Sequence, residues 1–373
     1  MAKYRIAVLP GDGVGKDVMD AAMIVLKKLK LDADLRFGDI GWEFWCKEGN
    51  PLPDRTIQLL KETDVCLFGA ITSKPKEETE KELAPQLRGK GFNYSSPPIV
   101  ALRQMFDLHT NLRPCRAFPG NPLNYRDDID LVVFRENTEG LYAGIEYHPL
   151  PKEVLDVLAK THPKMNRFAG IPPEDIAISL RLVTRKACQN IVRQAFTYAK
   201  KYGYKSVTVV EKPNILRETS GLMVREARKV ALEFPDIELW KANIDAMAMW
   251  LVKNPQDYGV LVATNMFGDI ISDLCAQLVG GLGFASSANI GDKYALFEPS
   301  HGSAPKYAGT YKVNPMAMLL TTKLMLDYLG EGEMTTRLEA AIARVVRAGK
   351  VRTYDMGGSN TTLEVAEAVS SYL

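Results

Sequence analysis

Short β-branched runs alternate with longer amphipathic segments along this chain, and this alternation constrains the fold more than any other feature. The strand-like runs are residues 4–10, 65–71, 131–135, 206–211 and 259–264. Helical periodicity marks, among other stretches, residues 17–29, 184–201 and 221–234. Strands that alternate with helices are typical of α/β proteins, whose sheets are largely buried. The sequence therefore predicts an α/β fold.

Length and charge set further bounds. The 373 residues are 46% hydrophobic, which is enough for a large core and predicts two domains. The 47 basic and 45 acidic residues are interspersed, which argues against nucleic acid or an anionic membrane as a partner. Apolar stretches are shorter than a membrane span, and residues 4–10 are too short for a signal peptide. We expect a cytoplasmic protein.

The cysteines are odd in number and widely scattered, and none stands in a Cys-x-x-Cys pair. They are Cys46, Cys66, Cys115, Cys188 and Cys275. This pattern disfavours both a disulfide framework and a structural zinc site. We expect reduced thiols, most of them in the core.

Two carboxylates stand four positions apart in the apolar run 265–274. If that run opens a helix, Asp269 and Asp273 lie on one face, about one turn apart. Carboxylates so placed repel one another and favour a cation between them, and oxygen ligands suit Mg²⁺ or Mn²⁺. The alternative is an Asp favoured by the helix dipole together with an exposed Asp on the polar face.

Two glycine-rich segments are candidates for binding a nucleotide. The first, 11–15, follows a strand, but Lys16 stands where the third glycine of G-x-G-x-x-G would be, so we expect a plain strand-to-helix turn. The second, 301–309, has small residues that let a ligand approach the backbone, with Lys306, Tyr307 and Lys312 nearby. It suits a phosphorylated adenosine, although a solvated surface loop has a similar composition.

Three arginines stand where strands or helices meet Pro/Gly clusters: Arg103, Arg113 and Arg135. Together they could clamp a di- or tricarboxylate, because a guanidinium binds carboxylate in bidentate fashion. Taken alone, each one is more often a surface or salt-bridging residue. The clusters at 95–98 and 114–122 predict crossings between domains, 149–173 an insertion or oligomer-forming arm, and 280–283 a return crossing.

In this order, the segments resemble the decarboxylating β-hydroxyacid dehydrogenases, a family that includes isocitrate, 3-isopropylmalate, homoisocitrate and tartrate dehydrogenases. The most specific stretches are 134–146 (FRENTEGLYAGIE), 265–274 (NMFGDIISDL), 288–292 (ANIGD) and 301–315 (HGSAPKYAGTYKVNP). The resemblance implies a two-domain fold distinct from the Rossmann fold. Residues 1–108 and 280–373 would form a discontinuous cofactor-binding domain. Residues 109–279 would form the substrate, metal and dimerisation domain, with a subunit-clasping arm near 147–175.

The resemblance also implies roles for individual residues. Asp269 and Asp273 resemble the family's metal ligands, and Asp245 resembles the ligand that the partner subunit contributes. The substrate's carboxylates would be clamped by Arg103, Arg113 and Arg135, and the acid/base pair would be Tyr142 and Lys212. Lys212 and Asp245 are expected to reach the neighbouring subunit's site. A homodimer with shared active sites follows, and a tetramer is compatible with it.

Cofactor choice is implied in the same way. The residues that resemble the cofactor site are Asn214, Glu298, His301, Gly302, Ser303, Ala304, Lys306, Tyr307, Val313, Asn314 and Tyr354. In this family, Lys-Tyr after His-Gly-Ser-Ala-Pro accompanies the ribose phosphate of NADP, whereas Asp there holds the ribose of NAD. Lys306, Tyr307 and Tyr354 therefore favour NADP, with NAD as the alternative. Gly358 stands where a further phosphate-binding Arg would be expected.

The substrate's variable arm leaves alternatives open. The resemblance favours metal-dependent oxidative decarboxylation of isocitrate to 2-oxoglutarate, with Thr72 and Ser73 as candidate contacts for a distal carboxylate. However, Pro97 and Ile99 replace the Ser-x-Asn of the best-known bacterial isocitrate enzymes, so homoisocitrate and 3-isopropylmalate remain alternatives. Outside this class, a non-catalytic regulatory subunit or a metal-dependent phosphohydrolase could also contain the paired aspartates.

Overall fold

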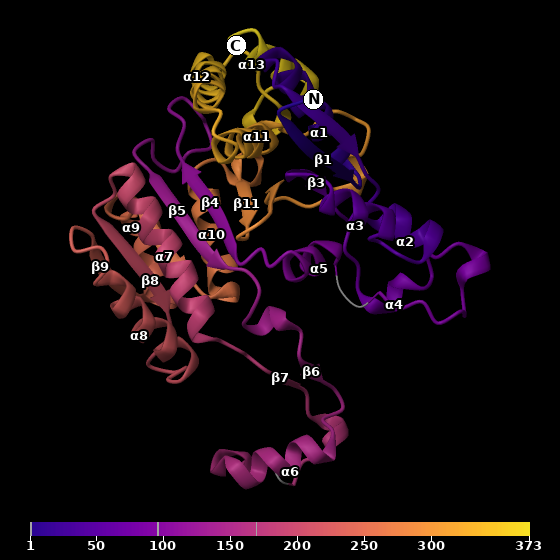
Figure 1. The fold of residues 1–373 in the computed structure, drawn as a ribbon, viewed down its shortest axis with the longest axis vertical. Coiled ribbons are helices and arrows are strands. Elements are labelled where there is room, and N and C mark those ends of the chain that lie inside the picture. The colour runs from indigo at the N-terminus through magenta and orange to yellow at the C-terminus, as the bar shows by residue number, and fades with distance from the viewer. Residues whose placement is uncertain (1, 95–96, 169) are drawn as a thin grey trace.

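A ten-stranded mixed sheet runs through the molecule (Figure 1). The structure, a computed structural model, describes residues 2–94, 97–168 and 170–373. Ser95 and Ser96, in the first expected crossing, and Ala169, in the expected arm, lie outside the described residues. The strand order is β2-β1-β3-β12-β11-β4-β5-β10-β8-β9. The strands are β1 (Tyr4–Gly11), β2 (Ala33–Phe37), β3 (Val65–Ala70), β4 (Thr110–Arg116), β5 (Asp130–Glu136), β8 (Ser206–Glu211), β9 (Glu238–Asn243), β10 (Val260–Ala263), β11 (Ser286–Ile290) and β12 (Ala295–Pro299).

The α/β prediction is confirmed, and the five predicted strands form with ends shifted by at most one residue. The flanks of the sheet are parallel, but β12, β11, β4 and β5 pair antiparallel at its centre. All five cysteines are free; Cys46 is half-buried and the other four are buried, as predicted. None of the described helices is both long and apolar enough to cross a membrane.

Helices cover both faces of the sheet. They are α1 (Val14–Leu29), α2 (Trp42–Glu48), α3 (Asp54–Lys61), α4 (Lys76–Thr79), α5 (Pro98–Met105), α6 (Lys152–Thr161), α7 (Arg185–Tyr202), α8 (Thr219–Ala231), α9 (Ile244–Lys253), α10 (Asn265–Leu278), α11 (Met316–Tyr328), α12 (Gly332–Ala348) and α13 (Thr362–Ser370). One apolar cluster joins the two ends of the chain, with Val18, Phe297 and Ile342 among its members. The proposed domain division stays a prediction, because the sheet is continuous across both parts.

The side chains of β5 alternate between the two faces of the sheet, and this alternation decides which of them contact α10. In β5, Val132 and Phe134 pack with α7 and α8, whereas Leu131 and Val133 pack with α9 and α10. Successive strand residues point to opposite faces. Arg135 therefore shares the α10 face with Leu131 and Val133, and it bonds to Asn265 at the start of α10.

Pro114, the first residue of the expected crossing at 114–122, lies inside β4. Pro114 lies opposite Val132 in the β4–β5 pair. The Val132 N–H points away from β4 and donates to the carbonyl oxygen of Gly259, just before β10. The nitrogen of Pro114 thus faces β11, where the ladder has already ended at Leu112. A missing N–H disrupts no ladder bond at that point, so a proline is tolerated in an interior strand.

An arm projects from the body of the molecule (Figure 1). Two short strands, β6 (Glu146–Tyr147) and β7 (Ile178–Ser179), pair antiparallel at its base, and α6 lies toward its far end. The segment from β6 to β7 includes the expected arm at 147–175. Its function as a subunit clasp stays a proposal.

Gly268 sets the distance between α10 and β5. A Cβ at Gly268 would lie 2.7 Å from the Cβ of Arg135. We expect Gly268→Ala to lower the free energy of unfolding by about 1–3 kcal/mol, because α10 must move away from the sheet. Urea unfolding measures the change.

The matched control is another helical glycine. Gly221→Ala in α8 would contact only the flexible end of Arg225, at 3.1 Å. We expect it to raise the free energy of unfolding by up to about 1 kcal/mol, since alanine is the better helix former. A loss for Gly221→Ala as large as that for Gly268→Ala would contradict the packing argument.

Candidate active site

Arginine and aspartate side chains converge between β4, β5 and α10. Arg135 is fully buried and donates to Asn265 Oδ1 from Nε at 2.9 Å and from Nη2 at 2.7 Å. Its Nη1 donates to Asp269 Oδ1, which Arg113 Nη1 also approaches at 3.2 Å. The same nitrogen of Arg113 lies 3.2 Å from Asp273 Oδ1. The predicted placement of both aspartates on one helix face is therefore confirmed.

Tyr142 joins this cluster from a short 3₁₀ turn after β5. Its hydroxyl donates to Asp269 Oδ2 at 2.6 Å, and the guanidinium of Arg135 lies 4.9 Å from its ring centre. Burial, reinforced by the hydrogen bond to Asp269, raises the pKa of Tyr142. Tyr142 therefore holds its proton at neutral pH and can act as a proton donor.

The arginines control ionisation in the cluster. Burial opposes the charge on Asp269, but Arg135 and Arg113 hold the pKa of that carboxyl below its usual range. Burial raises the pKa of Asp273. Burial, with repulsion from Arg113, lowers the pKa of Arg135 to about 10, so the guanidinium remains charged at neutral pH.

Asp269 and Asp273 supply oxygen ligands that suit a divalent cation, but two carboxylates alone do not complete a metal site. Asp269 and Asp273 oxygens approach the same arginine nitrogen, so they converge on one small region. Carboxylate oxygens are suitable ligands for Mg²⁺ or Mn²⁺. Across the described parts of the chain, however, no three His, Cys, Asp or Glu side chains converge as a metal site. One chain thus supplies two of the three predicted metal ligands in one place.

Lys212 and Asp245 form an ion pair with one another. Lys212 Nζ donates to Asp245 Oδ1 at 2.5 Å, and the Asp245 carboxylate is largely exposed. This hydrogen bond lowers the pKa of Asp245. The pair comes from the end of β8 and the first turn of α9. Among the described residues, no hydrogen bond or ion pair joins either of these two side chains to Asp269 or Asp273.

Arg103 and Glu298 form a buried ion pair. Arg103 Nη2 donates to Glu298 Oε1 at 2.9 Å, and that oxygen also accepts from Asn289 at 2.8 Å. Arg103 Nε is buried and has no partner among the described residues. Arg103 is thus held from α5 against β12, and it lies close enough for its charge to act on Arg135, Tyr142 and Asp269. Whether the three arginines clamp one substrate remains a proposal.

A cavity of about 470 Å³ is lined by many of the residues predicted for the cofactor. Val14, Leu123 and residues 280–283 line it together with His301, Gly302, Ala304, Val313, Asn314 and Tyr354. The rings of Tyr307 and Tyr354 stack with centres 5.8 Å apart, and Lys306 Nζ lies 4.9 Å from the Tyr307 ring centre. Asn214 is exposed near Lys212 and does not line this cavity.

Three further positions named from the sequence, Thr72, Ser73 and Gly358, do not line the cofactor cavity. Thr72 Oγ1 and Ser303 Oγ are 2.7 Å apart, and Ser73 beside Thr72 is exposed. Gly358 is packed so tightly that a Cβ would lie 2.1 Å from the carbonyl oxygen of Arg352. An arginine side chain at 358 would need the backbone to move, which accounts for the glycine there.

Sequence reasoning missed two aspartates that organise the loops around this cavity. Asp12 accepts the backbone N–H groups of Trp42, Glu43 and Thr72, at 2.6, 3.1 and 2.9 Å. Asp17, buried in α1, accepts those of Gly309 and Tyr311, both at 3.1 Å. The turn at 11–15 is the expected plain strand-to-helix turn. A Cβ at Gly13 would lie 2.1 Å from the Ser303 carbonyl oxygen, so the turn packs directly on the second glycine-rich segment.

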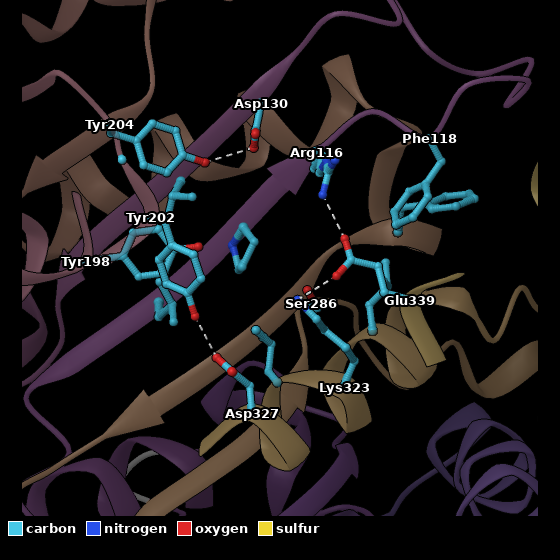
Figure 2. A pocket seen from close by; sticks show the side chains of 17 residues that line it. Arg116, Phe118, Asp130, Tyr198, Tyr202, Tyr204, Ser286, Lys323, Asp327 and Glu339 are labelled. Carbon is cyan, nitrogen blue, oxygen red and sulfur yellow. Dashed lines mark hydrogen bonds and ion pairs between the residues drawn. The ribbon is translucent and has the colours of Figure 1, made fainter. Parts of the chain in front are cut away.

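Another pocket, of about 550 Å³, lies on the opposite face of β4 and β5 (Figure 2). Its walls include Tyr198, Tyr202 and Tyr204 of the α7 region, and Asp327 of α11 receives the Tyr202 hydroxyl at 2.8 Å. Leu112 and Pro114 line it, whereas Arg113 between them points to α10. None of the residues predicted for the active site lines this pocket.

The whole chain is similar to known proteins. Residues 5–369 match the family described as Isocitrate/isopropylmalate dehydrogenase. The 3-isopropylmalate dehydrogenase of Methanothermobacter thermautotrophicus is 40% identical over 373 residues, 100% of this chain and 99% of that protein. Protein DlpA of Legionella pneumophila is 41% identical over 98% of this chain, which spans 58% of DlpA's length. The crystal structure of isocitrate dehydrogenase from Methylococcus capsulatus has a TM-score of 0.85 at 37% identity, covering 99% of both chains.

Asp269 is the anion that two buried guanidiniums share. We expect Asp269→Asn to lower the free energy of unfolding by about 3 kcal/mol at pH 7, because it leaves the buried charge of Arg135 uncompensated and that of Arg113 paired with the exposed Asp273 alone. Since the pKa of Asp269 is lowered in the folded protein, its stabilisation is lost as the pH falls through that lowered value. The difference between wild type and variant should be full at pH 7 and shrink below about pH 4. Urea unfolding across this range measures it.

Asp273→Asn is the matched control. The Asp273 side chain is 60% exposed and approaches one guanidinium, at 3.2 Å. We expect a loss below about 1 kcal/mol, as for other solvent-screened ion pairs. Equal losses for the two variants would contradict the assignment of Asp269 as the main counter-ion.

Proposed function

Because the chain belongs to the isocitrate/isopropylmalate dehydrogenase family, whose members are metal-dependent decarboxylating dehydrogenases, we propose that it oxidises and decarboxylates isocitrate to 2-oxoglutarate with NADP⁺. The observation that carries this proposal is the convergence of Arg113, Arg135 and Tyr142 on Asp269. Two guanidiniums beside a carboxylate pair and a protonated phenol match a hydroxy acid that must be bound by its carboxylates and then reprotonated.

The metal and the cofactor have candidate ligands in this chain. Asp269 and Asp273, with Asp245 of a second copy, would hold Mg²⁺ or Mn²⁺, which would polarise the substrate's hydroxyl and, later, its carbonyl. The cavity beside Tyr354 would hold the dinucleotide, whose nicotinamide accepts the hydride. Lys306, Tyr307 and Tyr354 would then bind the ribose phosphate.

The chain's own residues would carry the proton transfers. Arg113 and Arg135 bind the substrate's carboxylates and are released from Asp269 as they do so. Lys212 accepts the proton of the 2-hydroxyl, directly or through a relay. After CO₂ leaves, Tyr142 donates a proton to the carbon that carried it. The raised pKa of Tyr142 is consistent with that last role, because the phenol keeps its proton until the enolate forms.

A second copy of the chain is part of this proposal. Lys212 and Asp245 bond to one another and, within the described residues, to neither Asp269 nor Asp273, so they would act in the partner's site. Apolar side chains are exposed near them: Met249, Trp250 and Val252 on α9, and Ile215 beside Lys212. Exposed apolar patches of this kind mark protein interfaces. We further propose that 1–108 with 280–373, and 109–279, are the two domains that close around the substrate.

The substrate's third substituent has a second candidate. Pro97 at the N-cap of α5 and Ile99 in its first turn stand where isocitrate enzymes of the bacterial type have polar residues. An apolar α5 favours homoisocitrate, or 3-isopropylmalate as in the Methanothermobacter relative. A regulatory subunit without activity is the alternative of another class, but all five proposed catalytic and metal residues are present in the sequence.

The decisive experiment measures kcat/KM with Mg²⁺ for isocitrate, homoisocitrate, 3-isopropylmalate, tartrate and malate, each with NADP⁺ and NAD⁺. We expect the highest value for isocitrate with NADP⁺. A preference for homoisocitrate or 3-isopropylmalate would mean that α5 determines the substrate and would overturn the isocitrate assignment.

Two controls belong to this experiment. Asp269→Asn should abolish activity with every substrate at saturating Mg²⁺, and survival of activity would remove the metal mechanism. The active wild-type species should sediment as a dimer or a larger assembly. An active monomer in analytical ultracentrifugation would contradict shared active sites.

Cofactor choice is tested at two side chains. We expect Lys306→Asp combined with Tyr307→Ile to weaken NADP⁺ by about 1.5–3 kcal/mol, because a charge-assisted contact to the phosphate is lost. The kcat/KM ratio of NADP⁺ to NAD⁺ should fall accordingly. An unchanged ratio would remove the NADP assignment.

A further inference from the structure

A buried carboxylate stands directly before Lys212. Glu211 ends β8 and is fully buried, whereas Lys212 beside it reaches the surface. Both oxygens of Glu211 are used. Oε1 accepts from the backbone N–H of Thr264 at 3.0 Å and from its hydroxyl; Oε2 accepts from Ser220 Oγ and from Arg181 Nη2 at 3.1 Å. A buried charge is expensive unless it is saturated in this way.

The partners of Glu211 come from the segments that carry the proposed reacting groups. Thr264 is the N-cap of α10, the helix of Asp269 and Asp273. Ser220, in α8, accepts the backbone N–H of Lys212 at 3.3 Å. Glu211 thus bonds the end of β8, and with it Lys212, to the start of the aspartate helix.

Arg181 extends the same network to Tyr142. Its Nη2 also donates to Thr264 Oγ1 at 2.6 Å, and its guanidinium lies 4.9 Å from the ring centre of Phe267, two residues before Asp269. The next residue, Leu182, exchanges backbone hydrogen bonds with Gly140, two residues before Tyr142. Arg181 also lies two residues beyond β7 at the base of the arm.

We propose that Glu211, held by Arg181, is a positioning residue that sets Lys212 relative to the Asp269 helix and the Tyr142 turn. This inference rests on the proposed function, in which Lys212 and Tyr142 transfer protons. Glu211 touches neither substrate nor cofactor and acts through Lys212 and Thr264. The base of the arm is thereby bonded to the segments of both proton-transfer residues.

An amide at position 211 cannot replace the carboxylate. The Thr264 N–H on one side and the Arg181 guanidinium on the other are obligate donors. Glutamine offers one accepting oxygen and one donating nitrogen, so a donor must face a donor on one side. Glu211→Gln therefore keeps the volume of the side chain but forces one of the two segments to shift. Displacements of about 1 Å at reacting groups reduce rates by about 10²-fold.

The test compares Glu211→Gln with Glu226→Gln. Glu226 is also a buried carboxylate that takes part in ion pairs. It joins α8 to α7 through Gln189 and Arg185 and, within the described residues, makes no bond to Lys212. We expect Glu211→Gln to lower kcat about 10²-fold with the KM of the hydroxy acid changed less than about threefold. Glu211→Asp, which keeps the charge, should recover part of kcat. Glu226→Gln should lower thermal stability and leave kcat within about twofold.

A second readout does not depend on catalysis. Hydrogen exchange at the amides of Thr264 and Lys212 should accelerate at least about tenfold in Glu211→Gln and stay near wild type in Glu226→Gln. A folded Glu211→Gln with unchanged kcat, or with exchange no faster than the control, overturns the positioning role. If the wild-type protein oxidises none of the hydroxy acids, the proposed function fails, while the exchange rates still decide whether Glu211 fixes the two segments.

Discussion

The pairing of Asp269 with two guanidiniums is the interaction on which the candidate site depends. Arg135 is fully buried, and its charge is tolerated because Asp269 and Asn265 saturate it from the start of α10. The contact also ties α10 to the central strands β4 and β5. A ligand that brings carboxylates together with a divalent cation could replace these ion pairs. The ligand's carboxylates would pair with Arg113 and Arg135, and the cation would pair with Asp269, so that no buried charge would lose its counter-ion. The ion pairs seen in the free protein therefore match the charges of the ligands that the family binds.

Local sequence patterns predicted the parts of the fold that depend on local chemistry. The spacing of Asp269 and Asp273 placed both on one face of α10, and β-branched runs identified five strands. The antiparallel centre of the sheet could not be derived in this way, because pairing between β11 and β4 joins residues far apart in the chain. That Pro114 lies inside a strand could not be derived for the same reason, because a proline is tolerated in a strand only where the neighbouring strand no longer pairs with it.

The candidate site shows the same limit. Tyr142 and Lys212 were singled out only through the family resemblance, since a tyrosine or lysine after a strand carries no local signal. Asp12 and Asp17 were missed because an aspartate in a turn or a first helical turn is ordinary, and their acceptor roles are defined by amides about 30 to 290 positions away. Arg103 was grouped with Arg113 and Arg135 by sequence context; its ion pair with Glu298 could not be derived in that way, because it joins residues 195 positions apart.

The anchoring of residues 309–311 by Asp17 has a consequence for how such proteins diverge. The main chain of that loop is held by α1, whereas Lys306 lies against the ring of Tyr307 and Tyr307 stacks on Tyr354. Substitutions at 306 and 307 therefore remove ring contacts but leave the backbone bonds to Asp17 in place. Under the proposed function these two side chains select the redox carrier, so natural drift could change that selection while the bonds to α1 persist. The same separation would make this loop a starting point for laboratory evolution of coenzyme preference.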